Sequence, residues 1–196
     1  MHKFDVSKMN KLDNPRRREL LPPEEILQKL KLEKGEVFAD VGCGIGYFSI
    51  PAARIAGETG TVYALDIAPQ MLQVVAEKAE QEGLVNIKPV QCREYDFVLP
   101  EAAAATVFTC NVLHEVPDQY RFLSEMKRLL KKEGKMVIID WEKVQSDYGP
   151  PIEHRIDKEE VRSLLEKLRF KELTIDSIHG YFYMITARNG KDLQAD

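Results

Sequence analysis

The segment Val37–Phe48, VFADVGCGIGYF, is the feature that most constrains the fold of this chain. An apolar run that suits a β-strand is followed by three glycines at alternate positions, Gly42, Gly44 and Gly46, and then by a helix-like stretch. Because glycine lacks a Cβ, the backbone at these positions can turn tightly and let a ligand approach closely. The segment therefore predicts a strand–loop–helix unit of an α/β protein, with a ligand at the loop.

A second unit narrows the class of ligand. The run Thr61–Asp66 reads as a strand that ends in a carboxylate, and such an acid on the second strand holds an adenosine ribose in doubly wound folds. A dinucleotide-binding loop, G-x-G-x-x-G, would require glycine at position 47, where this chain has the bulky Tyr47. The pattern here is G-x-G-x-G preceded by Asp40, which disfavours a nicotinamide-dependent oxidoreductase.

Strands and helices alternate along most of the chain, which predicts a parallel sheet with right-handed crossovers. The predicted strands are Val37–Val41, Thr61–Asp66, Asn86–Gln91, Thr106–Cys110, Lys135–Asp140, Lys171–Ser177 and Tyr181–Ala187. The predicted helices are Pro23–Lys31, Tyr47–Ala56, Pro69–Glu82, Asp118–Lys132 (closed at Gly134) and Asp157–Leu168. The tight turn at residues 178–180 makes the last two strands antiparallel. Residues 1–14 are expected to form a loose arm.

The motif D-V-G-C-G-I-G, Asp40–Gly46, resembles the first motif of class I S-adenosylmethionine-dependent methyltransferases of the quinone-biosynthesis or small-molecule type. The resemblance covers roughly residues 35–187. It implies a single Rossmann-like α/β domain, a three-layer sandwich around a seven-stranded, mostly parallel sheet whose last strand is antiparallel. We accordingly expect an N-terminal arm and helix over residues 1–34 and the S-adenosylmethionine-binding domain over residues 35–196.

The resemblance also implies a set of cofactor-binding residues. Asp66 corresponds to the ribose-binding acid, the Gly42–Gly44 backbone would face the methionine portion, and Asn111 would meet the amino group unless it only caps a turn. The full set is Asp40, Gly42, Cys43, Gly44, Gly46, Asp66, Ile67, Met71, Arg93, Glu94 and Asn111. Ile67 and Met71 suit either an adenine face or ordinary core packing.

The resemblance to the family motifs is weaker after the third predicted strand. The family position whose Asp or Asn meets the adenine amino group falls on Arg93, which cannot accept a hydrogen bond. Two alternatives remain open there. Either Glu94 or Asp96 takes that role through a local shift, or Arg93 stacks on the adenine and the backbone reads it.

The acceptor side is predicted from residues after the fourth and fifth strands. The segment Asn111–Asp118, NVLHEVPD, resembles the motif after strand four of small-molecule methyltransferases, and His114 is the candidate general base or orienting residue. A histidine that only packs against a helix is the alternative. The candidate acceptor-binding residues are Glu115, Trp141, Tyr148 and His154.

Composition excludes some classes of function and leaves others open. The net charge of −4 and the lack of a long apolar run predict neither a nucleic-acid nor a membrane partner. The cluster Arg16–Arg18 is read as a solvated helix face paired with Glu19, Glu24 and Glu25, with an anion site as the alternative. Oligomeric state is not indicated.

The cysteine pattern bears on metal binding and on compartment. The chain has three cysteines, Cys43, Cys92 and Cys110, and no C-x-x-C pair, so we expect no metal site and a reducing, cytoplasmic setting. All three follow or end a predicted strand. They are read as small side chains beside the cofactor, with arsenic methylation kept as a minor option.

The function predicted from these features is transfer of the methyl group of S-adenosylmethionine to a small-molecule acceptor by in-line displacement, with S-adenosylhomocysteine as product. Positioning the acceptor beside the methyl carbon can supply most of the acceleration. A methyltransferase acting on a protein or RNA and a non-catalytic S-adenosylmethionine-binding protein are the alternatives.

Overall fold

The computed structural model describes residue 9 and residues 12–190, so most of the predicted arm lies outside the described residues. A seven-stranded sheet with the order β3-β2-β1-β4-β5-β7-β6 forms the middle layer. Its strands are β1 (Val37–Val41), β2 (Thr61–Asp66), β3 (Ile87–Gln91), β4 (Ala104–Cys110), β5 (Leu130–Trp141), β6 (Phe170–Ile178) and β7 (Phe182–Asn189).

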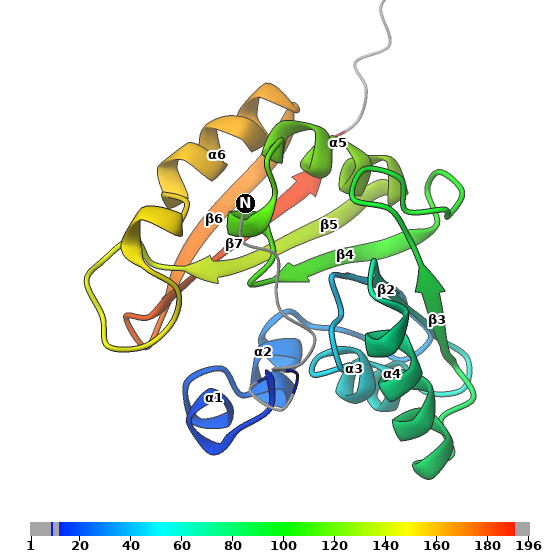
Figure 1. Ribbon diagram of the computed structural model, residues 1–196. Coiled ribbons are helices and arrows are strands. Elements are labelled where there is room, and N and C mark those ends of the chain that lie inside the picture. Colours follow the sequence, from blue (N-terminus) through cyan, green and yellow to red (C-terminus); the bar gives the residue numbers. More distant parts are fainter. Residues whose placement is uncertain (1–8, 10–11, 191–196) are drawn as a thin grey trace, which may run out of the picture.

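Helices cover both faces of this sheet (Figure 1). On one face lie α2 (Pro23–Lys29), α3 (Ser49–Ala56) and α4 (Pro69–Gln81), with α1 (Pro15–Leu20) beside α2. On the other lie α5 (Gln119–Leu129) and α6 (Lys158–Lys167). Two short 3₁₀ turns, η2 (Leu113–Glu115) and η3 (Ile152–His154), follow β4 and β5. The three-layer architecture predicted from the sequence is confirmed.

The strand order reverses direction at β1, which pairs in parallel with β2 on one side and with β4 on the other. Ligands of open α/β sheets bind outside the carboxyl ends of the strands at such a switch point. Among the described strands, β7 alone is antiparallel to the rest of the sheet, since it runs against both β5 and β6. The sheet therefore presents the ends of β1, β2 and β4 together at one edge.

The sheet separates two apolar cores. Phe38, Phe108 and Ile139 face α2, α3 and α4, whereas Val107, Ile138 and Tyr183 face α5 and α6. Both sets are buried because successive residues of a strand point to opposite faces. This is why the central strands carry continuous apolar runs rather than an alternation of apolar and polar residues.

The predicted helix Asp118–Lys132 with its stop at Gly134 is wrong at its carboxyl end. The helix α5 ends at Leu129, and β5 begins at once with Leu130, which pairs with Ala104 of β4. The β4–β5 register then shifts, and a Cβ on Gly134 would lie 2.7 Å from the Lys131 carbonyl oxygen. Gly134 therefore allows the irregularity in β5 rather than ending a helix. In this segment, strand pairing overrides the helix propensity.

Smaller differences occur at other element ends. Turns delay the start of α3 from Tyr47 to Ser49, and β5 begins at Leu130 rather than at the predicted Lys135. The remaining boundaries lie close to the predicted ones. Helix α1 was not delimited from the sequence, although its signals are present: the Asn14 side chain accepts a hydrogen bond from the Arg17 amide at 2.9 Å, and Pro15 follows it. Among the described residues, no helix combines the length and apolarity needed to cross a membrane.

Candidate active site

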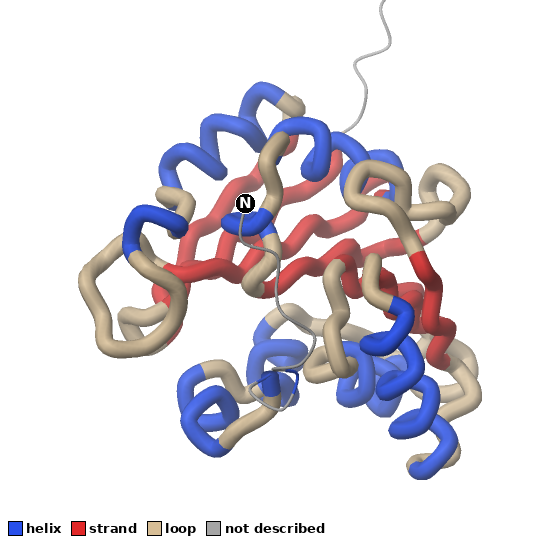
Figure 2. The backbone as a smooth tube through the Cα atoms, in the orientation of Figure 1, coloured by secondary structure: helices blue, strands red, loops and turns tan. Residues whose placement is uncertain are grey.

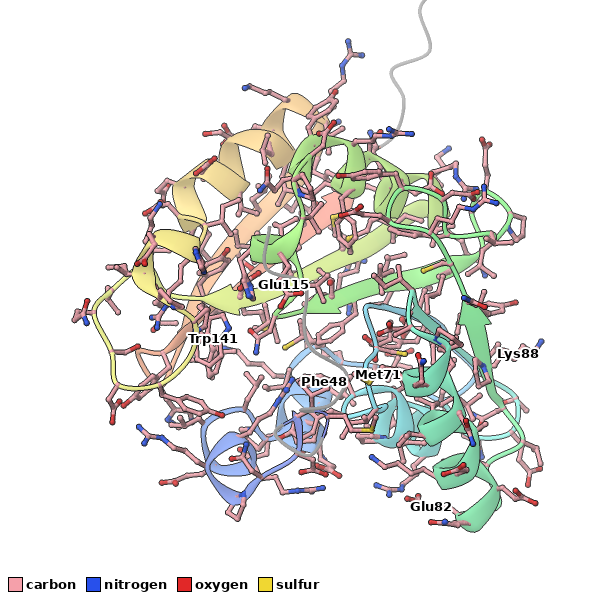
Figure 3. The ribbon with its side chains drawn as sticks, in the orientation of Figure 1. Phe48, Met71, Glu82, Lys88, Glu115 and Trp141 are labelled. Atoms are coloured by element: carbon pink, nitrogen blue, oxygen red, sulfur yellow. The ribbon has the colours of Figure 1, made fainter. Side chains whose placement is uncertain are left out.

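Two neighbouring cavities open at the carboxyl edge of the sheet. The first, of about 350 Å³, is lined by residues that follow β1, β2, β3 and β4 and by Leu12 and Arg17 from the N-terminal segment. The second, of about 440 Å³, lies between η2, η3 and the starts of α5 and α6. Glu115 and Val116 line both, so the two cavities adjoin. Figure 3 shows Glu115 at the end of β4, with Met71 and Phe48 on the α3–α4 side.

The glycine loop and Asp66, which the sequence singled out separately, meet in the first cavity. The Gly44 amide donates to Asp66 Oδ2 at 2.8 Å, and the Ala68 amide donates to Asp66 Oδ1 at 2.9 Å. Burial raises the pKa of Asp66, and these backbone hydrogen bonds oppose that rise. The carboxylate is thereby held at the cavity wall, where each oxygen retains a lone pair for a further donor.

The loop needs glycine for two different reasons. Gly42 has φ of +75°, and a Cβ there would lie 2.4 Å from Val112 Cγ2. Gly46 has φ of +78°, but its added Cβ would meet Val75 and Ile50 in the core, at 3.1 and 3.2 Å. Gly42 and Gly44 line the first cavity, while Gly46 is not among its lining residues. Gly46 therefore shapes the turn into α3.

Asp40 also lies behind the loop rather than in the cavity wall. It is 2% exposed, and Ser49 Oγ at the start of α3 donates to its Oδ2 at 2.5 Å. Burial raises the pKa of Asp40 to about 7, and the Ser49 hydrogen bond opposes this rise. This hydrogen bond joins the end of β1 to the start of α3, so Asp40 stabilises the glycine loop that lies between them.

Residues that follow β2 and β3 also line the first cavity. Ile67, Met71, Cys92, Arg93 and Glu94 line it. Arg93 points largely to solvent and lies 3.9 Å from Asp96, which is not among the lining residues. Of the two acids left open for adenine recognition, Glu94 is the one that the structure brings to the cavity.

Two aromatic residues that the sequence did not single out also line this cavity. Phe97 and Phe122 line the cavity with their rings in an edge-to-face arrangement, 5.4 Å between centroids. Phe97 follows β3 in a loop and Phe122 lies in α5, so neither belongs to a local motif. Their apolar faces suit a flat aromatic ligand.

Asn111 stands at the end of β4 in an uncommon conformation. Its φ is +57°, and its amide donates to the Ile139 carbonyl oxygen at 2.8 Å. Its side-chain Oδ1 is buried and lacks a hydrogen-bond partner within the described part of the chain. If Asn111 only capped a turn, this oxygen would accept a hydrogen bond from the backbone. The missing partner therefore favours the interpretation that Asn111 contacts a bound molecule.

His114 lines the second cavity, not the first, and is held by a buried acid. Its Nδ1 lies 2.7 Å from Asp140 Oδ1, and its amide donates to Asp140 Oδ2 at 3.1 Å. Burial lowers the pKa of His114, but the charge and hydrogen bond of Asp140 together outweigh it and raise the pKa. The contact with Asp140 places the proton on Nδ1 and leaves Nε2, 3.8 Å from Glu115, as the basic nitrogen.

The remaining acceptor candidates fall into two groups. His154 and Glu115 line the second cavity. Trp141 packs against Phe182 and Tyr148, with centroid distances of 4.3 and 5.3 Å, and neither Trp141 nor Tyr148 lines either cavity. The structure therefore does not bring these four residues together.

Arg155 organises the long loop between β5 and α6. The side chain is 3% exposed and donates to the carbonyl oxygens of residues 142, 144, 148 and 150 and to the Ser146 hydroxyl. An arginine in a loop sequence carries no local sign of such a role. This network shapes the wall of the second cavity.

The interpretation of Arg16–Arg18 as a face paired with nearby glutamates is corrected by the structure. Arg16 pairs with Asp147 at 3.1 Å and donates to the Tyr181 hydroxyl at 3.2 Å, and Arg18 pairs with Asp13 at 2.6 Å. Arg17 lines the first cavity. Asp147 and Tyr181 lie far away in sequence, which is why the chain alone could not reveal these partners; Figure 2 shows α1 beside the loop after β5.

The three cysteines share the first cavity, as their positions at strand ends predicted. Cys43, Cys92 and Cys110 are free thiols among its lining residues. Burial raises the pKa of both Cys92 and Cys110 to about 12, so these thiols stay protonated. Among the described residues, no group of three or more histidine, cysteine or acidic side chains is placed to hold a metal ion.

Comparison with known proteins agrees with this geometry. The model of a methyltransferase-domain family matches residues 32–169. A demethylmenaquinone methyltransferase of Geobacillus sp. strain WCH70 is 32% identical over 124 residues, 63% of this chain and 53% of that protein. The chain thus spans about half the length of the curated relatives it matches.

Solved structures extend the similarity over nearly the whole chain. A SAM-dependent methyltransferase from Aquifex aeolicus superimposes with a TM-score of 0.89 and 34% identity over 95% of this chain and 99% of that one. An arsenic(III) S-adenosylmethionine methyltransferase from Chlamydomonas reinhardtii, 23% identical with a TM-score of 0.62 over 83% of this chain and 66% of that one, shares the fold.

The first cavity suits the cofactor of this family. The glycine loop leaves its floor open, Asp66 offers a carboxylate, and Asn111 offers a buried oxygen without a partner in the described chain. These are the acceptors that ribose hydroxyls and an ammonium group require. The chain belongs to the class I S-adenosylmethionine-dependent methyltransferases, enzymes whose cofactor is S-adenosylmethionine and whose product is S-adenosylhomocysteine.

Proposed function

We propose that this protein binds S-adenosylmethionine in the first cavity and transfers its methyl group to a small-molecule acceptor. The contact between the glycine loop and Asp66 carries the proposal, because it joins backbone that admits a close ligand to a carboxylate that suits two hydroxyls. When bound, the cofactor supplies a methyl group on a positively charged sulfur that a nucleophile displaces in line.

The chain's own residues would hold the ends of the cofactor. Asp66 would accept from the ribose hydroxyls and Asn111 Oδ1 from the amino group. The apolar side chains of Ile67, Met71, Phe97 and Phe122 would enclose the adenine, with Glu94 as its polar contact. In this assignment Asp40 and Gly46 support the loop without touching the ligand.

His114 would act as general base from the second cavity. Asp140 holds its ring by a 2.7 Å contact at Nδ1, so Nε2 can take a proton from an acceptor in the second cavity. A positioned base of this kind contributes roughly 10²–10⁴ in rate. Glu115, which lines both cavities, would orient the acceptor where they adjoin, and His154 would contact its outer part.

The acceptor class is proposed from the relatives of this chain. The curated relatives are named for methylation of demethylmenaquinone, so a hydroxylated aromatic ring is the first acceptor to test. Trp141 and Tyr148 would act indirectly, by packing beneath the loop that bounds the site. The division at residue 34 and the cytoplasmic setting stay predictions.

A second candidate function is supported by one observation. His114 is nearly buried and is not among the residues that line the first cavity, as a cofactor-binding protein without turnover would allow. Because methyl transfer can proceed by positioning alone, this placement is also compatible with catalysis. Turnover with a panel of small acceptors separates the two candidates.

The first test is calorimetric titration with S-adenosylhomocysteine and with NAD. The wild-type protein should bind S-adenosylhomocysteine and not NAD, and Asp66→Ala should weaken binding roughly 100-fold or more, since charge-assisted hydrogen bonds are lost. Asp13→Ala, which removes a carboxylate from a surface ion pair with Arg18, is the matched control and should bind like wild type. Binding of NAD, or an unaffected Asp66→Ala protein, contradicts the proposal.

A further inference from the structure

Arg17, in α1, lines the first cavity, and the proposed function has not yet given it a role. Its Nε is buried and has no hydrogen-bond partner among the described residues. The Arg17 side chain contacts the Cys110 thiol, whereas its neighbours on α1 are paired with acids, Arg16 with Asp147 and Arg18 with Asp13. A buried donor without a partner destabilises the folded chain unless a ligand or water accepts its hydrogen bond.

The position of Arg17 is fixed by the surrounding structure. Its guanidinium lies 4.5 Å from the centroid of the Tyr47 ring, and the Tyr47 hydroxyl donates to the Leu21 carbonyl oxygen at 2.9 Å. The Asn14 side chain caps the Arg17 amide at 2.9 Å. Arg17 and the glycine loop line the same cavity, so these contacts hold the Arg17 side chain in place before a ligand binds.

The unsatisfied groups of the first cavity form a complementary pair. Arg17 Nε is a donor and Asn111 Oδ1 is an acceptor, and within the described chain they are the two buried side-chain atoms without a partner. Both belong to residues that line the same cavity. An α-amino acid head group carries a carboxylate and an ammonium group on one carbon, and it would satisfy both atoms at once.

We propose that Arg17 binds the carboxylate at the amino acid end of the bound cofactor, while Asn111 Oδ1 accepts from its ammonium group. The assignment rests on the proposed function of the first cavity. It also makes α1 part of the binding site, although α1 lies outside residues 32–169 that match the family model. Guanidinium is suited to this task, because its planar fork matches a carboxylate.

The test compares two ligands that differ only in the carboxylate: S-adenosylhomocysteine and its decarboxylated analogue, S-adenosyl-3-thiopropylamine. Calorimetry on wild-type protein should give roughly 10- to 100-fold tighter binding of S-adenosylhomocysteine, the range expected for a charge-assisted contact. In Arg17→Gln this preference should fall to within about threefold, with the affinity for the decarboxylated analogue unchanged. In Arg17→Lys, which keeps the charge without the fork, an intermediate preference is expected.

Arg18→Gln is the matched control, since it removes the same charge from the next position of α1 and should keep the wild-type preference. Thermal unfolding checks that each variant folds, and Arg17→Lys carries the test if Arg17→Gln does not. An equal loss of affinity for both ligands, or an unchanged preference, overturns the assignment of Arg17. Failure of wild-type protein to bind either ligand overturns the proposed function itself, and that result is distinct from the first two.

Discussion

Most walls of the first cavity are segments that follow β1, β2, β3 and β4, joined by a few side chains such as Arg17 and Phe122, whereas the second cavity lies between η2, η3 and the starts of α5 and α6. In the first, the Gly44 amide meets Asp66 across neighbouring strands. In the second, Asp140 of β5 holds His114 of η2, and Arg155 ties together the loop after β5. This difference fits the proposed function, in which the first cavity binds a cofactor of constant shape and the second binds an acceptor that varies among enzymes.

This contrast teaches where specificity can change. A strand-end loop can alter only within narrow limits, because the sheet fixes its ends and the glycine conformations exclude side chains. A loop held by one arginine can be rebuilt by changing the residues around it. Four predictions test this distinction, beginning with the largest expected effect.

His114→Gln should lower turnover roughly 10²–10⁴-fold while the affinity for S-adenosylhomocysteine stays unchanged. Burial lowers and Asp140 raises the pKa of His114, and the raised result means that the neutral base appears only above a pH higher than usual for histidine. Wild-type activity should therefore rise with pH through that raised pKa, and the variant should lose this rise. Steady-state kinetics across pH measures both effects.

Unchanged turnover in His114→Gln would retire His114 as a base. That result would also favour the second candidate function, a protein that binds the cofactor without catalysis. A parallel loss of cofactor affinity would show that the two cavities are not independent, which would break the comparison above.

Arg155→Met should lower the free energy of unfolding by about 3 kcal/mol or more, because several loop carbonyl oxygens lose their donor at a buried position. Affinity for S-adenosylhomocysteine in the folded variant should change little. Urea denaturation and calorimetry measure the two quantities. Arg162→Met, on the exposed face of α6, is the control and should change stability by less than about 1 kcal/mol.

Gly42→Ala, at the first cavity, should lower the free energy of unfolding more than Gly83→Ala, at the end of α4. Both glycines have positive φ, +75° and +66°, so both variants carry a similar conformational penalty. Only Gly42 has Val112 Cγ2 at 2.4 Å from an added Cβ, whereas an added Cβ at Gly83 meets nothing within 4 Å among the described residues. We expect a difference of about 1–3 kcal/mol in denaturation experiments, from overpacking; equal losses would mean that the loop can yield.

Arg16→Ala and Asp147→Ala should show the smallest effect. Their ion pair joins α1 to the loop after β5, but both side chains are exposed. A double-mutant cycle on stability should find a weak coupling that falls further as salt is added. A coupling that persists at high salt would show that the two regions are joined more firmly than the geometry suggests.

Local patterns in the chain were sufficient to predict the core of the fold. The strands Val37–Val41 and Thr61–Asp66 occur as predicted, and the last strand is reversed because a tight turn permits no other arrangement. The end of α5 was not predictable in this way. Leu130 joins the sheet because Ala104 lies opposite to receive it, and that partner is remote in sequence.

The sequence by itself determined the glycine loop, the strand-end acid and hence the family, because these features depend on backbone conformation within a few residues. Only the tertiary structure decided that Arg17 enters the first cavity, that Asp140 holds His114 and that Trp141 packs in the core. Each of these depends on which distant segments pack together, and that choice follows from burial of the whole apolar surface rather than from any short pattern.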